Sequence, residues 1–152
     1  STRLADYDHA FPYKEGSMNQ SSGLLFARGQ KNISLTGFGT IDGQGGSETF
    51  QFGNDGDGGP KRPKLIYLVE CQGIVVTDLT LRNSAYWVQH YERCEDVTIR
   101  GLKVFSHCNY NNDGLDIDAK NATISDCYID VEDDAICFKS DHPEFCEKRY
   151  RT

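Results

Sequence analysis

The chain has 152 residues and a formal net charge of −7, which disfavours a nucleic-acid partner because nucleic-acid-binding proteins normally present a basic patch. Hydrophobic residues make up 38% and charged residues 26%, which is typical of a folded domain and not of a disordered chain. No apolar stretch is long enough to cross a membrane, so no membrane partner is expected. The acidic balance allows an acidic substrate only if local cations bind it.

A short pattern of alternating apolar residues recurs along the chain and is typical of half-buried β-strands. In chain order the pattern occupies residues 31–35, 72–76, 95–99 and 120–124. Second strands are expected at 39–41, 79–81, 102–104 and 127–129, and third strands at 86–88, 115–117 and 135–138. The last three repeats begin 23 and 25 residues apart, which predicts an all-β solenoid, specifically a right-handed parallel β-helix.

Two other architectures fit the repeat less well. The signature of leucine-rich repeats is absent, and hairpin turns of the kind that a sandwich or barrel needs do not recur in register. The glycine-rich stretch at about 43–63 lengthens the first repeat and is predicted to be a surface loop. A calcium site in this loop is an alternative, although the acidic residues lack EF-hand spacing.

Three of the six cysteines occupy one position of the repeat. Cys71, Cys94 and Cys146 each precede a shared strand by the same interval, and Ala119 takes that place in the intervening repeat. We interpret them as a buried ladder of small apolar side chains, since an unoxidised cysteine behaves as a small hydrophobe. A disulfide between Cys71 and Cys94 on adjacent coils is the alternative. No cysteine pair has the C-x-x-C spacing of a zinc site.

Two acidic turns lie one repeat apart. Asp113 precedes Asp133 and Asp134 by 20 and 21 residues, and each turn opens a short apolar run. We align Asp113 over Asp133 and Gly114 over Asp134, which would separate the turns by about 4.8 Å, the ordinary spacing of strands. A one-residue bulge in one turn would shift this alignment by one residue and would still leave Asp113 beside the pair. Aspartate and glycine are also common turn residues, so each turn alone would be read as structural. Together they predict three crowded carboxylates, which cannot all ionise with ordinary pKa values.

Strand alternation predicts which side chains near these turns face solvent. Ile136 and Phe138 are the best inward-facing residues of the last strand, so Cys137 and Lys139 should point outward. Lys139 would then lie beside the acidic pair. There its ammonium could neutralise a carboxylate or bind an anionic group of a substrate.

Several of these segments together resemble glycoside hydrolase family 28, the polygalacturonase family. The run 111–117 resembles the N-T-D-G-x-D motif of the family, with Asn112 in the usual place of threonine, and 133–136 resembles its D-D motif. The run 37–45 matches its G-x-G-x-I-D-G-x-G turn, and 62–66 and Trp87 also fit. The resemblance covers residues from about 24 to 140, and the combination of motifs is specific where a single one is not.

The resemblance implies an inverting hydrolase whose substrate is a pectic polysaccharide or an oligogalacturonide. It implies Asp133 as the general acid, with Asp113 and Asp134 activating water, and no metal or cofactor. An inverting site leaves room for that water, with about 6.5–9.5 Å between the acid and base carboxyls. Apart from the resemblance, Lys139, His107 and His90 are the substrate-binding candidates, and for each histidine a hydrogen-bonded structural role near the acidic turns is the favoured alternative. A secreted or periplasmic location is expected for such an enzyme.

The family's G-H-G and R-I-K motifs do not follow the D-D motif within the 152 residues. We therefore expect residues 1–152 to form a single partial β-helix domain, truncated at both ends, and the rest of the same enzyme to complete the site. The isolated fragment is expected to be inactive, because an open solenoid end exposes strand edges. The alternatives are a β-helix polysaccharide lyase and a non-catalytic carbohydrate-binding β-helix.

Overall fold

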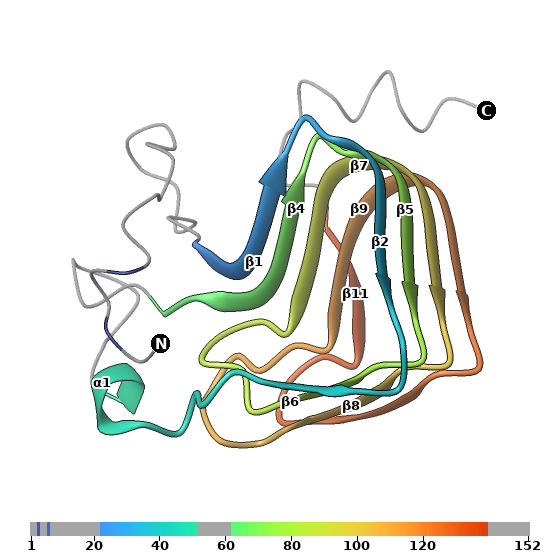
Figure 1. Cartoon of the computed structure of the whole chain (residues 1–152). Helices are drawn as coiled ribbons and strands as arrows, with labels where there is room; N and C mark the ends of the chain where they lie inside the picture. The colour runs from blue at the N-terminus through green and yellow to red at the C-terminus, as the bar shows by residue number, and fades with distance from the viewer. Residues whose placement is uncertain (1–2, 4–5, 7–21, 52–61, 140–152) are drawn as a thin grey trace.

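The computed structural model describes residues 3, 6, 22–51 and 62–139, and most of these residues lie in short parallel strands (Figure 1). The first two groups of strands are β1 (Gly23–Arg28), β2 (Lys31–Thr36), β3 (Thr40–Asp42), β4 (Lys64–Val69), β5 (Gln72–Thr77) and β6 (Thr80–Arg82). The later strands are β7 (Gln89–Arg100), β8 (Lys103–Ser106), β9 (Leu115–Ser125), β10 (Tyr128–Val131) and β11 (Ile136–Phe138). The only helix among the described residues is α1 (Glu48–Gln51).

These strands form successive coils of a parallel β-helix, as predicted. One sheet contains β1, β4, β5, β2, β7, β9 and β11, and the other runs in the order β10-β8-β6-β3. Strands β7 and β9 are long because each bends across two faces of the helix: the first part of β7 pairs with β4 and its second part with β5. Figure 1 shows the equivalent strands side by side along the axis. Every strand pair is parallel, which is the geometry of a solenoid whose coils stack on one another.

The alternating apolar residues fill the interior in columns. Ile33 pairs with Ile74, Ile74 with Val97 and Val97 with Ala122, which confirms the register that the repeat predicts. A second column on the other sheet joins Ile41, Leu81, Val104 and Ile129. Residues of each column lie one above another, so each coil buries its apolar side chains against the next.

The corners between faces are built from residues in the left-handed conformation. At one corner Asn32, Gly73, Asp96 and Asn121 have φ values of 58°, 71°, 56° and 58°. Glycine, asparagine and aspartate adopt this conformation at the lowest cost, which explains why these types recur at the corner. Asn121 Nδ2 also donates to Asp96 Oδ1 at 3.0 Å, so the corner side chains join neighbouring coils.

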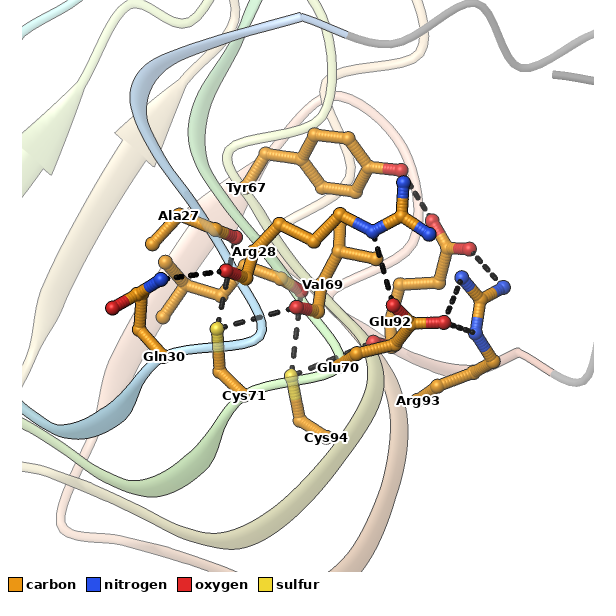
Figure 2. A network of polar contacts seen from close by, with 11 residues as sticks. Ala27, Arg28, Gln30, Tyr67, Val69, Glu70, Cys71, Glu92, Arg93 and Cys94 are labelled. Carbon is orange, nitrogen blue, oxygen red and sulfur yellow. Dashed lines mark hydrogen bonds and ion pairs between the residues drawn. The ribbon is translucent and has the colours of Figure 1, made fainter. Parts of the chain in front are cut away.

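The predicted cysteine ladder is confirmed where the structure describes it. Cys71 and Cys94 are 1% and 0% exposed, and Cys94 pairs in register with Ala119. The Cys71 thiol donates to Val69 O at 3.2 Å and the Cys94 thiol to Leu68 O at 3.4 Å (Figure 2). Both remain thiols, so the alternative of a disulfide between them is not realised. Cys146 lies outside the described residues.

Three details of the predicted elements were wrong. Residues 86–88 are not a strand, because the chain is still turning there after the left-handed Asn83, and β7 begins only at Gln89. The strands β1 and β4 were missed, since β4 is buried on both faces and does not alternate. The predicted loop at 43–63 contains α1, whose Phe50 is fully buried against Ala85. Residues 52–61 of that loop, with the conceivable calcium ligands, lie outside the described part of the chain.

No helix of the described residues is long and apolar enough to span a bilayer.

Candidate active site

The two acidic turns stack one residue out of the predicted alignment. Leu115 pairs with Ile136 and Ile117 with Phe138, which places Asp113 over Asp134 and Gly114 over Ala135. The backbone agrees, since Gly114 N donates to Asp134 O at 2.9 Å. This is the one-residue shift that a bulged turn allows, and it occurs because the register follows the inward apolar side chains and not the acidic residues. Ile136 and Phe138 point to the same side of the strand as the core residues Leu115 and Ile117, as predicted, although they are 42% and 80% exposed.

The three predicted aspartates do come together. One carboxylate oxygen from each of Asp113, Asp133 and Asp134 lies within 4.8 Å of the other two, close enough for a cation to lie among them. A Cβ on Gly114 would lie 2.6 Å from Ala135 O, so only glycine allows the turns to approach this closely. Asp113 is 3% exposed, whereas Asp133 and Asp134 are exposed.

A lysine and a fourth aspartate flank this cluster. Lys139 Nζ lies 3.5 Å from Asp113 Oδ2 and 3.2 Å from Asp116 Oδ1. The same ammonium lies 4.4 Å from the centroid of the Trp87 ring, a cation–π contact. Lys139 thus lies on the outer face beside the acidic turns, as strand alternation predicts.

Burial sets the electrostatics of these carboxyls. Burial and the negative charge of Asp113 raise the pKa of Asp116 to about 7, against the lowering effect of Lys139. Burial also raises the pKa of Asp113, with Lys139 opposing the shift and Asp133 adding to it. Burial lowers the pKa of Lys139, but Asp116 and Asp113 outweigh it and raise that pKa above its ordinary value. The ammonium therefore stays charged, while the two buried carboxyls hold protons more tightly than free aspartate does.

His90 lies beneath the site and not on its surface. It is 1% exposed, its Nδ1 is 2.8 Å from Lys64 Nζ, and its ring stacks on Tyr67 and meets the edge of Trp87. Burial, with the charge of Lys64, lowers the pKa of His90 well below its usual value, so the neutral ring can accept from the ammonium. This burial contradicts the candidate role of His90 in substrate binding and agrees with the alternative of a hydrogen-bonded structural histidine.

His107 is exposed, and its Nε2 contacts Asp130 Oδ1 at 2.7 Å. Asp130 belongs to β10, on the sheet that β3, β6, β8 and β10 form. No contact among the described residues joins His107 to the acidic turns, so its role in substrate binding stays a prediction.

Asn112, which stands where the related motif has threonine, holds the Asp113 turn in place. It is fully buried, and its Nδ2 donates to Ser84 O at 2.9 Å and Tyr86 O at 3.0 Å. Its Oδ1 accepts from Ser106 Oγ at 2.9 Å and from Asn109 N at 3.2 Å. Sequence reasoning treated this position only as a mild departure. An amide uses donors and an acceptor here that a threonine side chain could not all supply.

Comparisons with known proteins show which family the chain resembles in sequence. The model of the family "Glycosyl hydrolases family 28" matches residues 10–145. A polygalacturonase of Chamaecyparis obtusa is 35% identical over 125 residues, covering 78% of this chain and 24% of that protein. A polygalacturonase of Saccharomyces cerevisiae is 31% identical over 138 residues, covering 86% of this chain and 36% of that protein.

The fold has a counterpart among solved structures. A protein of Parabacteroides merdae ATCC 43184, named as a glycosyl hydrolase, aligns with a TM-score of 0.54 and 21% identity, over 76% of this chain and 55% of that one. At this identity the likeness shows the fold alone. The chain spans about a quarter to a third of the length of the two polygalacturonases that it matches. The family match over most of the chain identifies it as a member of glycoside hydrolase family 28.

Proposed function

We propose that this chain carries the acid–base part of the active site of a hydrolase that cleaves galacturonate-containing pectic polysaccharide. The observation that carries the proposal is the convergence of Asp113, Asp133 and Asp134, whose oxygens lie within 4.8 Å of one another on adjacent coils. Hydrolysis of a glycosidic bond needs a proton donor and a carboxylate that activates water or attacks the sugar. The similarity to polygalacturonases of a conifer and a yeast supports the substrate class.

In the proposed mechanism Asp133 protonates the glycosidic oxygen, while Asp113 and Asp134 activate water. The exposure of Asp133 supports its role, because a general acid must reach the bond that breaks. The raised pKa of Asp113 is the competing observation, since it favours Asp113 as the carboxyl that holds the proton. Both assignments use the same cluster, so the experiment must separate the acid from the base.

Matched variants separate these roles. Asp133→Asn should lower hydrolysis of the polymer by about 10²–10⁴-fold, the usual contribution of general acid catalysis. It should retain much more activity on an aryl galacturonide, because a good leaving group needs little protonation. Asp113→Asn should impair both substrates alike. The opposite pattern would make Asp113 the acid, and substantial residual activity in Asp133→Asn on the polymer would refute its assignment.

Inversion of the anomeric centre also belongs to this proposal, and it rests on the family resemblance. Inverting enzymes separate the two carboxyls by about 6.5–9.5 Å and retaining enzymes by about 5–5.5 Å. Proton NMR of the first product formed distinguishes the outcomes. The β-anomer from an α-linked substrate would support inversion, and the α-anomer would require a covalent intermediate.

The remainder of the same enzyme is proposed to complete the site with the cations that bind a uronate. The lysine beside the acidic turns is already paired with Asp113 and Asp116, so further cations would have to contact the substrate carboxylates. Because pectic polymers lie outside cells, we also propose a secreted or periplasmic location. Secretion of the intact protein into a culture medium would test this.

Product analysis distinguishes this proposal from its alternatives. New reducing ends from polygalacturonate, without ultraviolet absorbance, are the result expected of a hydrolase. An unsaturated product that absorbs in the ultraviolet would identify a lyase. Binding of oligogalacturonide with neither product would identify a non-catalytic β-helix, and either result would overturn the proposal.

A further inference from the structure

Arg62 joins three successive coils beneath the acidic turns. It lies just before β4, is 3% exposed, and its Nη1 donates to Ala85 O at 3.0 Å and to Tyr110 O at 2.6 Å. Its guanidinium lies 3.8 Å from the centroid of the Tyr110 ring and 4.8 Å from that of Tyr86. A planar cation with several donors is suited to hold two carbonyls and two rings at once, which a lysine ammonium cannot do.

The same guanidinium reaches the acidic cluster through one side chain. Arg62 Nη2 donates to Asn111 Oδ1 at 3.4 Å, and Asn111 Nδ2 donates to Asp133 Oδ2 at 3.4 Å. Arginine has donors and no acceptor, so the amide oxygen of Asn111 must face Arg62. The amide NH₂ then faces Asp133. Both hydrogen bonds of the Asn111 amide are long and weak, but together they allow only one orientation of the amide, with its oxygen toward Arg62 and its NH₂ toward Asp133.

The backbone of Asn111 strengthens this link. Asn111 has a φ of 53°, in the left-handed region, so the turn before Asp113 has a defined and unusual shape. Arg62 donates a short, charge-assisted hydrogen bond to the carbonyl of Tyr110, the residue before Asn111. Hence the guanidinium fixes both the backbone and the amide of the residue that contacts Asp133.

We propose that Arg62 is a positioning residue that acts through Asn111, holding its amide toward Asp133 and so placing that carboxylate against Asp113. This inference rests on the proposed function of the cluster, but its geometry can be tested separately. The competing explanation is that Arg62 serves only the stability of the fold, since Asn112 also ties this turn to the preceding coil through Ser84 O and Tyr86 O.

A double-mutant cycle distinguishes the two explanations. In the intact enzyme, Arg62→Lys keeps the positive charge but loses the paired donors of the guanidinium. It should lower kcat on polygalacturonate about tenfold, as expected of a small misplacement of a reacting group. Asn111→Ala should have a similar effect. In the Asn111→Ala background the further loss from Arg62→Lys should be under about twofold, because both variants break the same link. Arg82→Lys, on the other sheet and paired with Asp42, is the matched control and should change nothing.

NMR of the 152-residue chain gives a readout that needs no turnover. The two side-chain amide protons of Asn111 should give separate signals in the wild type and exchange at least about tenfold faster in Arg62→Lys, because the amide is released. In Asn111→Ala the Asp133 carboxyl carbon signal should shift, and this variant decides the matter if Arg62→Lys does not fold.

Each outcome has a stated consequence. Additive losses in the cycle, or an unchanged Asn111 amide in Arg62→Lys, would overturn the positioning role. An Asp133 signal unaffected by Asn111→Ala would do the same. If the intact enzyme cleaves no pectic substrate while the NMR changes occur in the chain, the proposed function fails and the link from Arg62 to Asp133 stands.

Discussion

Two charged regions of the β-helix are assembled in opposite ways. The first, which we call the charged corner, consists of Arg28, Tyr67, Glu70, Glu92 and Arg93 and lies where the first face of the helix ends (Figure 2). Glu70 accepts from Arg28 at 3.0 Å and pairs with Arg93 at 3.1 Å. Glu92 pairs with Arg93 at 2.5 Å and accepts a hydrogen bond from the Tyr67 hydroxyl. Each carboxylate of this corner thus faces a guanidinium on the same or a neighbouring coil.

The acidic turns combine like charges instead. Asp113, Asp133 and Asp134 crowd together, and the ammonium of Lys139 contacts only Asp113 of the three while also pairing with Asp116. The buried oxygens of Asp116 accept no well-aligned hydrogen bond among the described residues. This arrangement stabilises the protein less than the corner does, because buried carboxylates without full pairing are costly.

The pKa values of the two regions differ in the same sense. Burial raises the pKa of Glu70, but Arg28 and Arg93 outweigh burial and lower that pKa below its ordinary value. In the acidic turns burial prevails, and the pKa values of Asp113 and Asp116 are raised. Carboxyls whose environments hold protons at unusual pH are typical of catalytic sites. The comparison indicates that the corner serves stability, whereas the acidic turns have the raised pKa values that the proposed acid–base role would use.

The largest effect should come from breaking the charged corner. Arg93→Ala removes the partner of Glu92, which is 5% exposed, and should lower the free energy of unfolding by about 3–5 kcal/mol. Urea denaturation at pH 7 measures this loss. Arg93→Lys, which keeps one charge, should recover part of it. A loss below about 1 kcal/mol in Arg93→Ala would mean that the corner pairs are screened like surface pairs.

Removing the cation from the acidic turns should cost about 3 kcal/mol at pH 8. Lys139→Met removes the charge that lowers the pKa values of Asp113 and Asp116, so each buried carboxyl must either stay ionised without this partner or take up a proton. At pH 4 both carboxyls are largely protonated in the variant, so the loss should shrink. Urea denaturation at the two pH values measures this dependence. An equal loss at both would show that Lys139 acts through packing on Trp87 and not through its charge.

Asp116 should make stability fall as pH rises. Its pKa is about 7 in the folded state against 3.8 for a free aspartate, so between these values the folded state holds a proton that the unfolded state has lost. Stability from this group is therefore highest below pH 4, and up to about 4 kcal/mol is lost by pH 7. Asp116→Asn cannot titrate and should flatten this part of the profile. Urea denaturation from pH 4 to 8 measures the free energy of unfolding of both proteins. The same dependence on pH in the wild type and in Asp116→Asn would contradict the raised pKa of Asp116.

Sequence reasoning predicts the repeating parts of this molecule well, because stacking forces equivalent residues into columns. The column from Ile33 to Ala122 and the place of Cys94 beside Ala119 followed from period alone. Strand β4 was missed because it is buried throughout and shows no alternation. The one-residue error at Asp113 arose because a turn can change length while the strands beside it keep register.

The sequence predicts which residues form the candidate site, but it does not predict which of their side chains are buried. The motifs brought Asp113, Asp133 and Asp134 together, and alternation placed Lys139 beside them. They could not show that His90 is covered or that Asp116 is buried with a raised pKa, since these depend on side chains from several coils. Nor could they show that Arg62 reaches Asn111, 49 positions away in the sequence.

The smallest effect should mark the solvent edge of the charged corner. Arg28 and Glu70 have side chains that are 44% and 42% exposed, so Arg28→Ala should change the free energy of unfolding by less than about 1 kcal/mol, and less still in high salt. Glu70 keeps Arg93 as a partner in this variant, which limits the loss further. Urea denaturation with and without added salt measures both effects. A loss as large as that of Arg93→Ala would show that the five residues act as one cooperative network. Glu70 would then not be able to rely on Arg93 alone when Arg28 is removed, and the corner would be as sensitive to the loss of one cation as the acidic turns.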